Sequence, residues 1–368
     1  MPEHPQGHAL WQRAQRVLAG GPATLSKHPG RFPMGLAPMF LASGEGACVW
    51  DVDGHRYVDT IAALGPILLG HNDPRVTEAV WEQSERLTSA SLSTALEVEV
   101  AERLVEVIPG AEMCRFMKNG SDATNAAVRL ARAVTGKRHV ICAGYHGANY
   151  DWYAITTDKH AGVLANIAPY SHQVSWGDTA ALDEACGQAG DDLAVIIVEV
   201  PPFPWNGMTC GTPEERATIR AYQAAARTHK AVFVLDEVIT MLHYGLGGAQ
   251  AYYGIQADLV TGGKALANGL PLAVLTGTRD LMEHFHGGDP FCSYTFAGEA
   301  TALAACKATL RILQETDALE NLARQGRALG EGLSALFREY ALPVELWGNF
   351  ARLSLRWKSE DSLITDDA

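Results

Sequence analysis

A continuous run of apolar residues from Ala231 to Leu235 constrains the fold of this chain more than any other segment. Strands with one face in water alternate apolar and polar residues, whereas an unbroken apolar run is typical of a strand buried on both faces of a parallel sheet. Asp236 follows the run directly, so we expect it at the carboxyl end of a buried strand. Ligands collect at that edge of open α/β sheets, and an acid that emerges there from apolar surroundings needs a cationic partner.

Similar runs recur along the chain after residue 74 and alternate with segments of helical periodicity. We expect strands at residues 113–117, 139–142, 194–198, 231–235, 259–261 and 272–276. We expect helices at residues 78–87, 96–107, 121–134, 213–228 and 301–314. This alternation predicts an α/β fold with a mostly parallel, doubly wound sheet.

The chain has 368 residues, more than a single typical core contains, so two domains are expected. Residues 1–60 begin with an arm that is rich in Gly and Pro and continue into a β-hairpin, because Asp53-Gly54 lies between two β-rich runs. We expect this part to belong to a small domain, residues 61–290 to form the large domain, and residues 291–368 to complete the small domain.

Composition and charge exclude several classes of function. The 29 Lys and Arg residues against 42 Asp and Glu residues give a net charge of −13, which argues against nucleic acid as a partner. The seven cysteines are scattered, odd in number and without metal-ligand spacing, so we expect no metal site and a reduced, cytoplasmic setting. The sequence lacks the apolar core of a signal peptide and any apolar run of membrane-spanning length, so we expect no membrane contact.

A lysine follows Asp236 by about one strand–helix–strand crossover, at the end of Thr261-Gly262-Gly263-Lys264. Such a pair suits pyridoxal 5'-phosphate (PLP), because the aldehyde of this cofactor needs a lysine amine and its ring nitrogen needs an anion. Each residue also has an ordinary interpretation, since lysines after two glycines are often solvated and acids at strand ends are common. Lys264 and Asp236 are the candidate catalytic pair.

Several motifs, taken together in order and spacing, resemble those of the class III aminotransferases, which are PLP enzymes of fold type I. Within that family the chain is most similar to the glutamate-1-semialdehyde 2,1-aminomutase-like branch. The resemblance lies in residues 50–59, 70–71, 118–123, 145–147, 236–240, 247–248, 263–264 and 294–298. It implies a large domain with a seven-stranded, mostly parallel sheet flanked by helices, a small α+β domain, and a homodimer with the active site at the subunit interface.

The resemblance also implies roles for individual residues around the cofactor. Lys264 would form the internal aldimine and Asp236 would hold the ring nitrogen protonated. Gly120, Ser121 and Asp122 open a helix whose backbone N–H groups can face the cofactor phosphate, although an ordinary helix cap has the same sequence. The remaining cofactor contacts that the resemblance implies are Tyr145 and Val238 on the two ring faces, His146, Glu199, and Thr295 from the neighbouring subunit.

Substrate contacts are less closely defined by the sequence. Arg31 matches an arm arginine that binds a substrate carboxylate in the aminomutase branch, and a guanidinium suits that bidentate contact. Trp152, Tyr153 and Trp205 could line an apolar or sugar-stacking pocket, though aromatic residues are more often part of a core. Residues 200–205 and 241–243 depart from the family pattern, which indicates a rebuilt substrate pocket.

Two further departures affect the expected activity. The segment from Gly147 to Ser175 is shorter than the gating loop of the aminomutases and lacks its Gly-Ser-Gly signature, so a reaction intermediate should escape. The C-terminal domain also looks incomplete beside family members, which continue through another helix and strand. We therefore expect an aminotransferase that moves an amino group between an amino donor and an aldehyde or keto acceptor. The alternatives are an aminomutase, a racemase or epimerase, and a non-catalytic binding protein.

Overall fold

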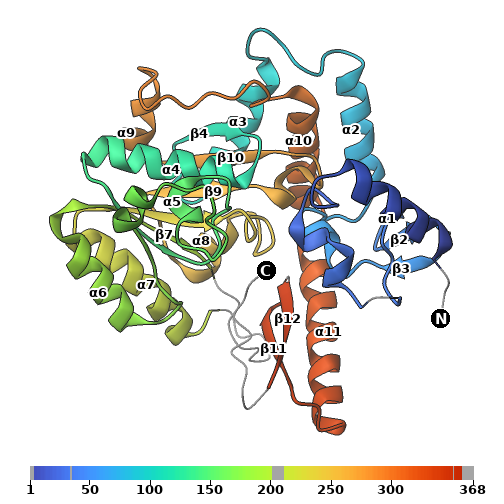
Figure 1. Cartoon of the computed structure of the whole chain (residues 1–368). Coiled ribbons are helices and arrows are strands. Elements are labelled where there is room, and N and C mark those ends of the chain that lie inside the picture. The colour runs from blue at the N-terminus through green and yellow to red at the C-terminus, as the bar shows by residue number, and fades with distance from the viewer. Residues whose placement is uncertain (1–3, 34, 201–210, 351, 359–368) are drawn as a thin grey trace.

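The computed structural model describes residues 4–33, 35–200, 211–350 and 352–358, and within them a seven-stranded sheet forms the centre of the molecule (Figure 1). Its strand order is β4-β10-β9-β8-β7-β5-β6, and β10 runs antiparallel to both of its neighbours. The other pairs are parallel, which confirms the predicted sheet. The strands are β4 (Met113–Met117), β5 (His139–Ala143), β6 (Ser171–Gln173), β7 (Leu193–Glu199), β8 (Val232–Glu237), β9 (Leu259–Gly262) and β10 (Ala273–Gly277).

Both faces of this sheet are buried, as the apolar runs predict. Every residue of β7, β8, β9 and β10 is buried. Side chains alternate between two separate hydrophobic clusters, so that Phe233 and Leu235 pack on one face while Val232 and Val234 pack on the other. Successive residues of a strand point to opposite faces, so a strand buried on both sides needs apolar residues throughout.

Helices cover the two faces of the sheet. Helix α4 (Gly120–Thr135) lies on one face, in the cluster with Val234, because its small residues allow close approach to β7, β9 and β10. The other face is covered by α3 (Ala95–Val107), α6 (Thr179–Ala189), α7 (Pro213–Thr228) and α10 (Ala300–Glu315). Helix α7 begins with a capping box between Thr212 and Glu215, which fixes its first turn. Four further α-helices lie between residues 74 and 282, namely α2 (Pro74–Ser84), α5 (Asp151–Ala154), α8 (Gly248–Tyr253) and α9 (Arg279–Met282).

The N-terminal part forms α1 (Pro5–Val17) and a small antiparallel sheet of β1 (Leu41–Glu45), β2 (Cys48–Asp51) and β3 (Arg56–Val58). This contains the predicted hairpin. Asp51 joins helix to hairpin, because its Oδ2 lies 3.1 Å from Nδ1 of His4 and 3.0 Å from Nδ1 of His55. The ligand atoms of these three residues lie within 4.8 Å of one another, a grouping that could hold a metal ion and that sequence spacing did not reveal.

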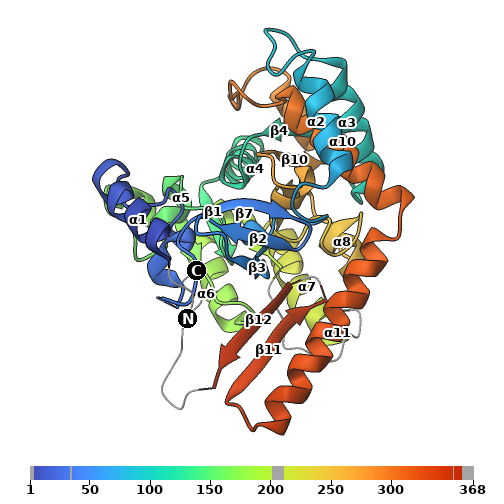
Figure 2. The ribbon, with the colours of Figure 1, turned by 90° about the vertical axis from the view of Figure 1, so that its right-hand side faces the viewer.

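The C-terminal part consists of the long helix α11 (Ala318–Glu339) and an antiparallel hairpin of β11 (Val344–Asn349) and β12 (Arg352–Trp357). The hairpin lies beside α11 (Figures 1 and 2). Helix α10 also follows residue 291, yet it packs against α2 and shares the core of the large sheet. The division at residues 60 and 290 therefore stays a prediction. None of the helices in the described residues has the length and hydropathy required to cross a bilayer.

Candidate active site

Three polar residues line up across the carboxyl edge of the sheet. Glu199 ends β7, Asp236 lies near the end of β8, and the strand register pairs Asp236 with both Glu199 and Thr261 of β9. All three side chains are buried. A buried carboxylate requires hydrogen-bond or cationic partners, so Glu199 and Asp236 must be stabilised by polar groups at this edge and not by apolar packing alone.

Asp236 is held by three donors. Its Oδ1 accepts from the Thr261 hydroxyl at 2.8 Å and from the Val238 backbone N–H at 3.0 Å, and its Oδ2 lies 2.7 Å from Nδ1 of His146. The other ring nitrogen of His146 lies 3.1 Å from the Ala143 carbonyl. An ionised carboxylate accepts about four hydrogen bonds, so Asp236 keeps one acceptor position for a further N–H group.

Lys264 lies two residues after the end of β9 and has a backbone φ of +45°, a left-handed conformation that is costly for a residue with a side chain. Burial lowers the pKa of its amine; Glu199 and Asp236 act in the opposite direction, and the nearby Arg352 adds to the lowering. A lowered pKa leaves more of the amine neutral and nucleophilic. The strained backbone, the burial and the adjacent carboxylates make Lys264 the candidate reactive group of this edge.

Loop residues before α2 close one side of the Lys264 environment. Gly65 lies so near that a Cβ atom at this position would be 3.9 Å from Cδ of Lys264 and 4.0 Å from Nε2 of His243. Asn268 holds the following loop, because its Oδ1 accepts from the backbone N–H groups of Leu68 and Leu69 at 2.9 Å. Segments about 200 residues apart in sequence therefore meet at the lysine.

Arg352 is a functional candidate that sequence reasoning missed. It lies on β12, and its Nη1 donates to Oε1 of Glu199 at 3.4 Å while Oε2 of the same carboxylate accepts from the Tyr145 backbone N–H. Burial raises the pKa of Glu199, and Arg352 opposes this increase. The sequence did contain a signal that could have identified Arg352. Arg352 and Arg356 are spaced by four residues in a segment with apolar residues between them, which places both cations on one face of a strand.

The first turn of α4 forms a cradle that side chains would fill. A Cβ atom at Gly120 would lie 2.5 Å from Cγ1 of Val238, and a Cβ atom at Gly147 would lie 2.0 Å from Oγ of Ser121. The Ser121 hydroxyl has no hydrogen-bond partner among the described residues. Free N–H groups, a free hydroxyl and the positive end of a 16-residue helix favour an anion at this place.

Asp122 belongs to the helix cap in this structure. Its carboxylate accepts from both the backbone and the side-chain amide of Asn119, and the Tyr150 hydroxyl donates to its other oxygen at 3.0 Å. The acid is buried, and both of its carboxylate oxygens have hydrogen-bond partners within the chain. Its direct contact with a phosphate stays a prediction, whereas its part in ordering the cradle follows from these contacts.

The structure also places the other three residues that were predicted to contact the cofactor, which are Tyr145, Val238 and Thr295. Tyr145 is 52% exposed and meets Tyr153 edge-on, with ring centroids 5.6 Å apart. Val238 packs between Gly120 and Gly263. Thr295 is exposed and lies in a turn closed by a hydrogen bond from the Ala297 N–H to the Tyr294 carbonyl, and its contact with the phosphate of a neighbouring subunit stays a prediction.

The predicted substrate residues are not brought to Lys264 by any contact that the described residues show. Arg31 is exposed at the end of a 3₁₀ turn (Pro29–Arg31). Trp152 is only 4% exposed and stacks obliquely on His146, with ring centroids 6.2 Å apart. Tyr153 is also buried, and Trp205 lies outside the described residues. These substrate contacts stay predictions.

The residues at this edge fit PLP in three respects. A partly buried lysine with a lowered pKa suits the aldehyde, and an anion with one free acceptor position suits the ring N–H. The cradle of Gly120, Ser121 and Gly147 suits the phosphate, since a side chain at either glycine would fill it.

Comparisons with known proteins identify the family and support the fold. The family model described as "Aminotransferase class-III" matches residues 33–354. A glutamate-1-semialdehyde 2,1-aminomutase from Methanothermobacter thermautotrophicus is 36% identical over 96% of this chain and 84% of the relative. The solved structure of the FumI protein from Sphingopyxis sp. MTA144, in its PLP internal aldimine form, has a TM-score of 0.86 and 29% identity over 96% of this chain and 84% of that one. An omega-transaminase from Sphaerobacter thermophilus also has a TM-score of 0.86, with 26% identity over 98% and 84% of the two chains.

Proposed function

Because this chain belongs to the class-III aminotransferase family, whose cofactor is PLP, we propose that it is an aminotransferase that moves an amino group from a small amine or amino acid to an aldehyde or keto acceptor. The observation that carries the proposal is the placement of Lys264, with its lowered pKa, at a sheet edge that also presents the buried Asp236. A basic amine next to a fixed anion provides the two groups that amino transfer requires.

Each residue of the candidate site would have a separate role in amino transfer with PLP. PLP supplies an aldehyde that takes up the amino group and a ring that withdraws electrons from the substrate carbon. Lys264 would hold the aldehyde through its amine, and the same amine, once displaced, would move the proton at the substrate carbon. Asp236 would keep the ring nitrogen protonated, while Thr261 and His146 hold the carboxylate in place. Gly120 and Ser121 would bind the phosphate.

Substrate binding is best supported at Arg352. Its bond to Glu199 is long, and the arginine side chain is 33% exposed, so an incoming carboxylate could replace Glu199 as its partner. Arginine suits this exchange because its planar guanidinium binds carboxylates through two parallel hydrogen bonds. Arg31 on the exposed arm is a second candidate for the same contact.

Amino transfer between two molecules is favoured over the aminomutase reaction by the segment that follows His146. The aminomutase must retain its intermediate between two half-reactions, and the shortened loop from Gly147 to Ser175 argues against a closed lid. The relative from M. thermautotrophicus carries the aminomutase name, which keeps that reaction as the second candidate. The similarity to an omega-transaminase supports the first.

A homodimer is also proposed, with Thr295 reaching the cofactor phosphate of the neighbouring subunit. The surface around Thr295 supports this, because Trp81, Leu92, Phe291 and Phe296 expose more than half of their area. The segment that contains Trp81 and Leu92 adjoins the segment that contains Phe291 and Phe296, because the Ala300 N–H donates a hydrogen bond to the Thr88 carbonyl. Exposed large apolar side chains gathered on one surface are typical of an interface. Light scattering at several protein concentrations tests the dimer.

The reaction is tested by a screen of amine donors against oxo acceptors on the PLP-loaded protein, followed by cofactor absorbance and by mass spectrometry of products. Transfer to an added acceptor is the expected result. Conversion of glutamate-1-semialdehyde without any acceptor would instead establish the aminomutase reaction. Inversion of a single amino acid enantiomer without acceptor would establish racemisation, and a colourless protein after addition of PLP would leave only a binding role.

A further inference from the structure

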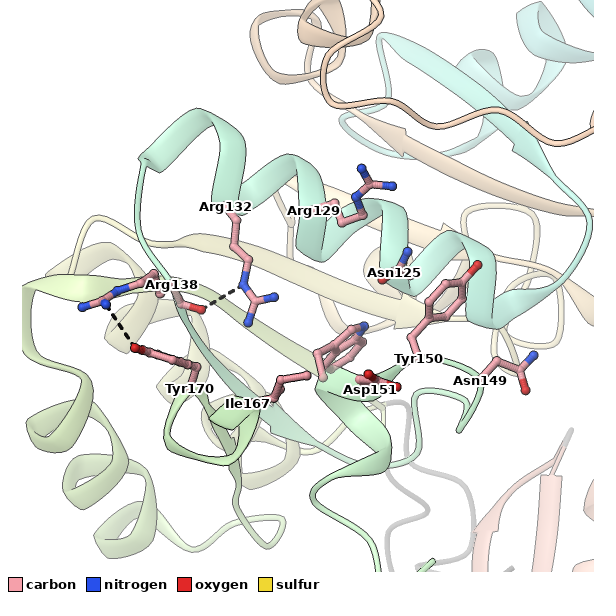
Figure 3. A pocket seen from close by; sticks show the side chains of 10 residues that line it. Asn125, Arg129, Arg132, Arg138, Asn149, Tyr150, Asp151, Ile167 and Tyr170 are labelled. Atoms are coloured by element: carbon pink, nitrogen blue, oxygen red, sulfur yellow. Dashed lines mark hydrogen bonds between the residues drawn. The ribbon is translucent and has the colours of Figure 1, made fainter. Parts of the chain in front are cut away.

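A cavity of about 640 Å³ lies beside α4, and Figure 3 shows the side chains that line it. Its walls come from α4, from α5 with the residues before it, and from a 3₁₀ helix (Ala165–Tyr170). Among the described residues, the lining includes neither Lys264 nor Asp236. Small-molecule sites commonly have volumes of about 300–1,000 Å³, so this cavity has the size of a ligand site separate from the active site.

Arginines dominate the charge of these walls. Arg129, Arg132 and Arg138 line the cavity, and Asp151 is the acid that lines it among the described residues. Figure 3 shows Arg129 and Arg132 extending from α4 and Arg138 lying to one side, near Tyr170. Three guanidinium groups at one cavity are unexpected in a chain with a net charge of −13, so this is a local concentration of positive charge.

Two of the three arginines keep free hydrogen-bonding capacity. Arg138 is engaged, because it pairs with Asp192 at 2.6 Å and donates to the Tyr170 hydroxyl. Arg132 donates to the Arg138 carbonyl only through Nε, and its half-buried guanidinium has a pKa lowered by burial. Arg129 has no hydrogen bond or ion pair among the described residues. Arg132 is half-buried without an ion pair among the described residues, and the exposed Arg129 lies one turn away, so both cations favour binding of an anion.

Uncharged donors point to the same kind of ligand. The indole Nε1 of Trp152 is buried without an acceptor among the described residues, and the whole side chain is 96% buried. Asn125, on the turn of α4 next to Arg129, is 92% buried and makes no side-chain hydrogen bond within the described chain, but its amide atoms are not fully closed off from solvent as the Trp152 nitrogen is. A buried donor without a partner is unfavourable, and an acceptor in the cavity would satisfy it.

We propose that this cavity is a second binding site, which takes a small molecule with phosphate or carboxylate groups. Arg129 and Arg132 bind its anionic oxygens, and Asn125 and the Trp152 indole donate to further acceptors. Guanidinium groups bind both kinds of anion in the same bidentate geometry, so phosphate and carboxylate ligands share this chemistry.

The site adjoins the active site through two contacts. The Tyr150 hydroxyl, at the cavity wall, donates to Asp122 in the first turn of α4. The Trp152 ring lies against His146, which in turn contacts Asp236. Two side chains therefore lie on each route: Tyr150 and Asp122 connect the cavity with the phosphate cradle, and Trp152 and His146 connect it with Asp236.

The test is a calorimetric titration of the full-length, PLP-saturated protein at low ionic strength with pyrophosphate, inorganic phosphate and citrate. Saturation with PLP keeps these probes from the cofactor cradle. Arg129→Gln is the main variant, because Arg129 is exposed and its replacement removes no internal contact. Trp152→Phe removes only the indole N–H. Arg324→Gln is the control, since Arg324 is also an exposed helical arginine, on α11, and its hydrogen bond to Asn321 lies far from the cavity lining in sequence.

We expect one anion per chain, with binding weakened about tenfold or more in Arg129→Gln, as for the loss of a hydrogen bond to a charged group. Trp152→Phe should weaken it less, and Arg324→Gln should leave it unchanged. Preference for pyrophosphate or for citrate would identify the ligand as phosphorylated or as a polycarboxylate. Absence of binding at millimolar concentration, or equal binding by the Arg129 and Arg324 variants, would overturn the proposal, as would binding lost on PLP saturation. None of these results depends on which reaction the enzyme catalyses.

Discussion

Replacement of Gly120 by alanine should weaken both the fold and the binding of PLP. A Cβ atom at this position would lie 2.5 Å from Cγ1 and 2.9 Å from Cγ2 of Val238. Carbon atoms normally pack at about 3.5–4.0 Å, so one of the two residues has to move by roughly 1 Å. Val238 is β-branched and stiff, and its backbone N–H is bonded to Asp236, so we expect the first turn of α4 to move instead.

Overpacking of this kind costs about 1–3 kcal/mol, and the better helix propensity of alanine offsets less than about 1 kcal/mol of it. We therefore expect the free energy of unfolding of the apoprotein to fall by about 1–2 kcal/mol in urea denaturation. A displaced helix end also weakens its bonds to the phosphate. Because a hydrogen bond to a charged group contributes about 1.5–3 kcal/mol, PLP affinity in a spectroscopic titration should fall about tenfold or more.

Further variants make this reasoning testable. The double variant Gly120→Ala with Val238→Ala removes both clashing methyl groups, so its PLP affinity should equal that of Val238→Ala alone, which a double-mutant cycle measures. Gly187→Ala is the control, because Gly187 lies exposed on α6 with no atom within 4 Å of an added Cβ, and this change should leave PLP binding unaltered. Equal PLP affinity of wild type and Gly120→Ala, or weaker PLP binding by the double variant than by Val238→Ala, would refute the proposed cradle.

Three other substitutions test the remaining parts of the site. Lys264→Ala should abolish turnover and borohydride labelling while the protein still binds PLP non-covalently, and peptide mapping that finds the label at another lysine would contradict the assignment. Arg352→Gln should raise KM for donors that carry a carboxylate about tenfold or more, with little effect on simple amines; an equal effect on both donor classes would argue against carboxylate binding. Burial raises the pKa of Glu237 from 4.5 to about 7, so the folded state binds this proton more tightly and stability should decrease by up to about 3 kcal/mol as pH rises from 4.5 to about 7. In Glu237→Gln, the free energy of unfolding from urea denaturation should depend less on pH between 4.5 and about 7. An unchanged pH dependence in this variant would show that the raised pKa of Glu237 is not the cause.

Local sequence patterns predicted the elements of the large domain closely. The expected helix at residues 213–228 coincides with α7, because Thr212, Pro213 and Glu215 provide a complete start signal. The expected strand at residues 113–117 coincides with β4. The short edge strand β6 was missed, since three residues with little apolar character carry no periodic signal.

The candidate site was predicted in part. The sequence placed Asp236 at a strand end and Lys264 after the next strand, because both positions follow from the apolar runs that precede them. It did not indicate that His146 would contact Asp236 across 90 residues, or that the β11–β12 hairpin would bring Arg352 to Glu199 across 153 residues. Contacts at such separations depend on how elements pack, and single-sequence periodicity contains no information on that packing.

By itself, the sequence determined which segments become strands and helices, that the sheet is buried on both faces, and that a lysine and an acid meet at its carboxyl edge. Periodicity and capping act over a few residues, so they can be read from the chain directly. Only the tertiary structure decided the partners of Asp236, the pairing of Arg352 with Glu199, and the arginine-lined cavity behind α4. The reason is physical: charge pairs and cavities form where separate elements meet, and their energies depend on distances that are set only when those elements pack together.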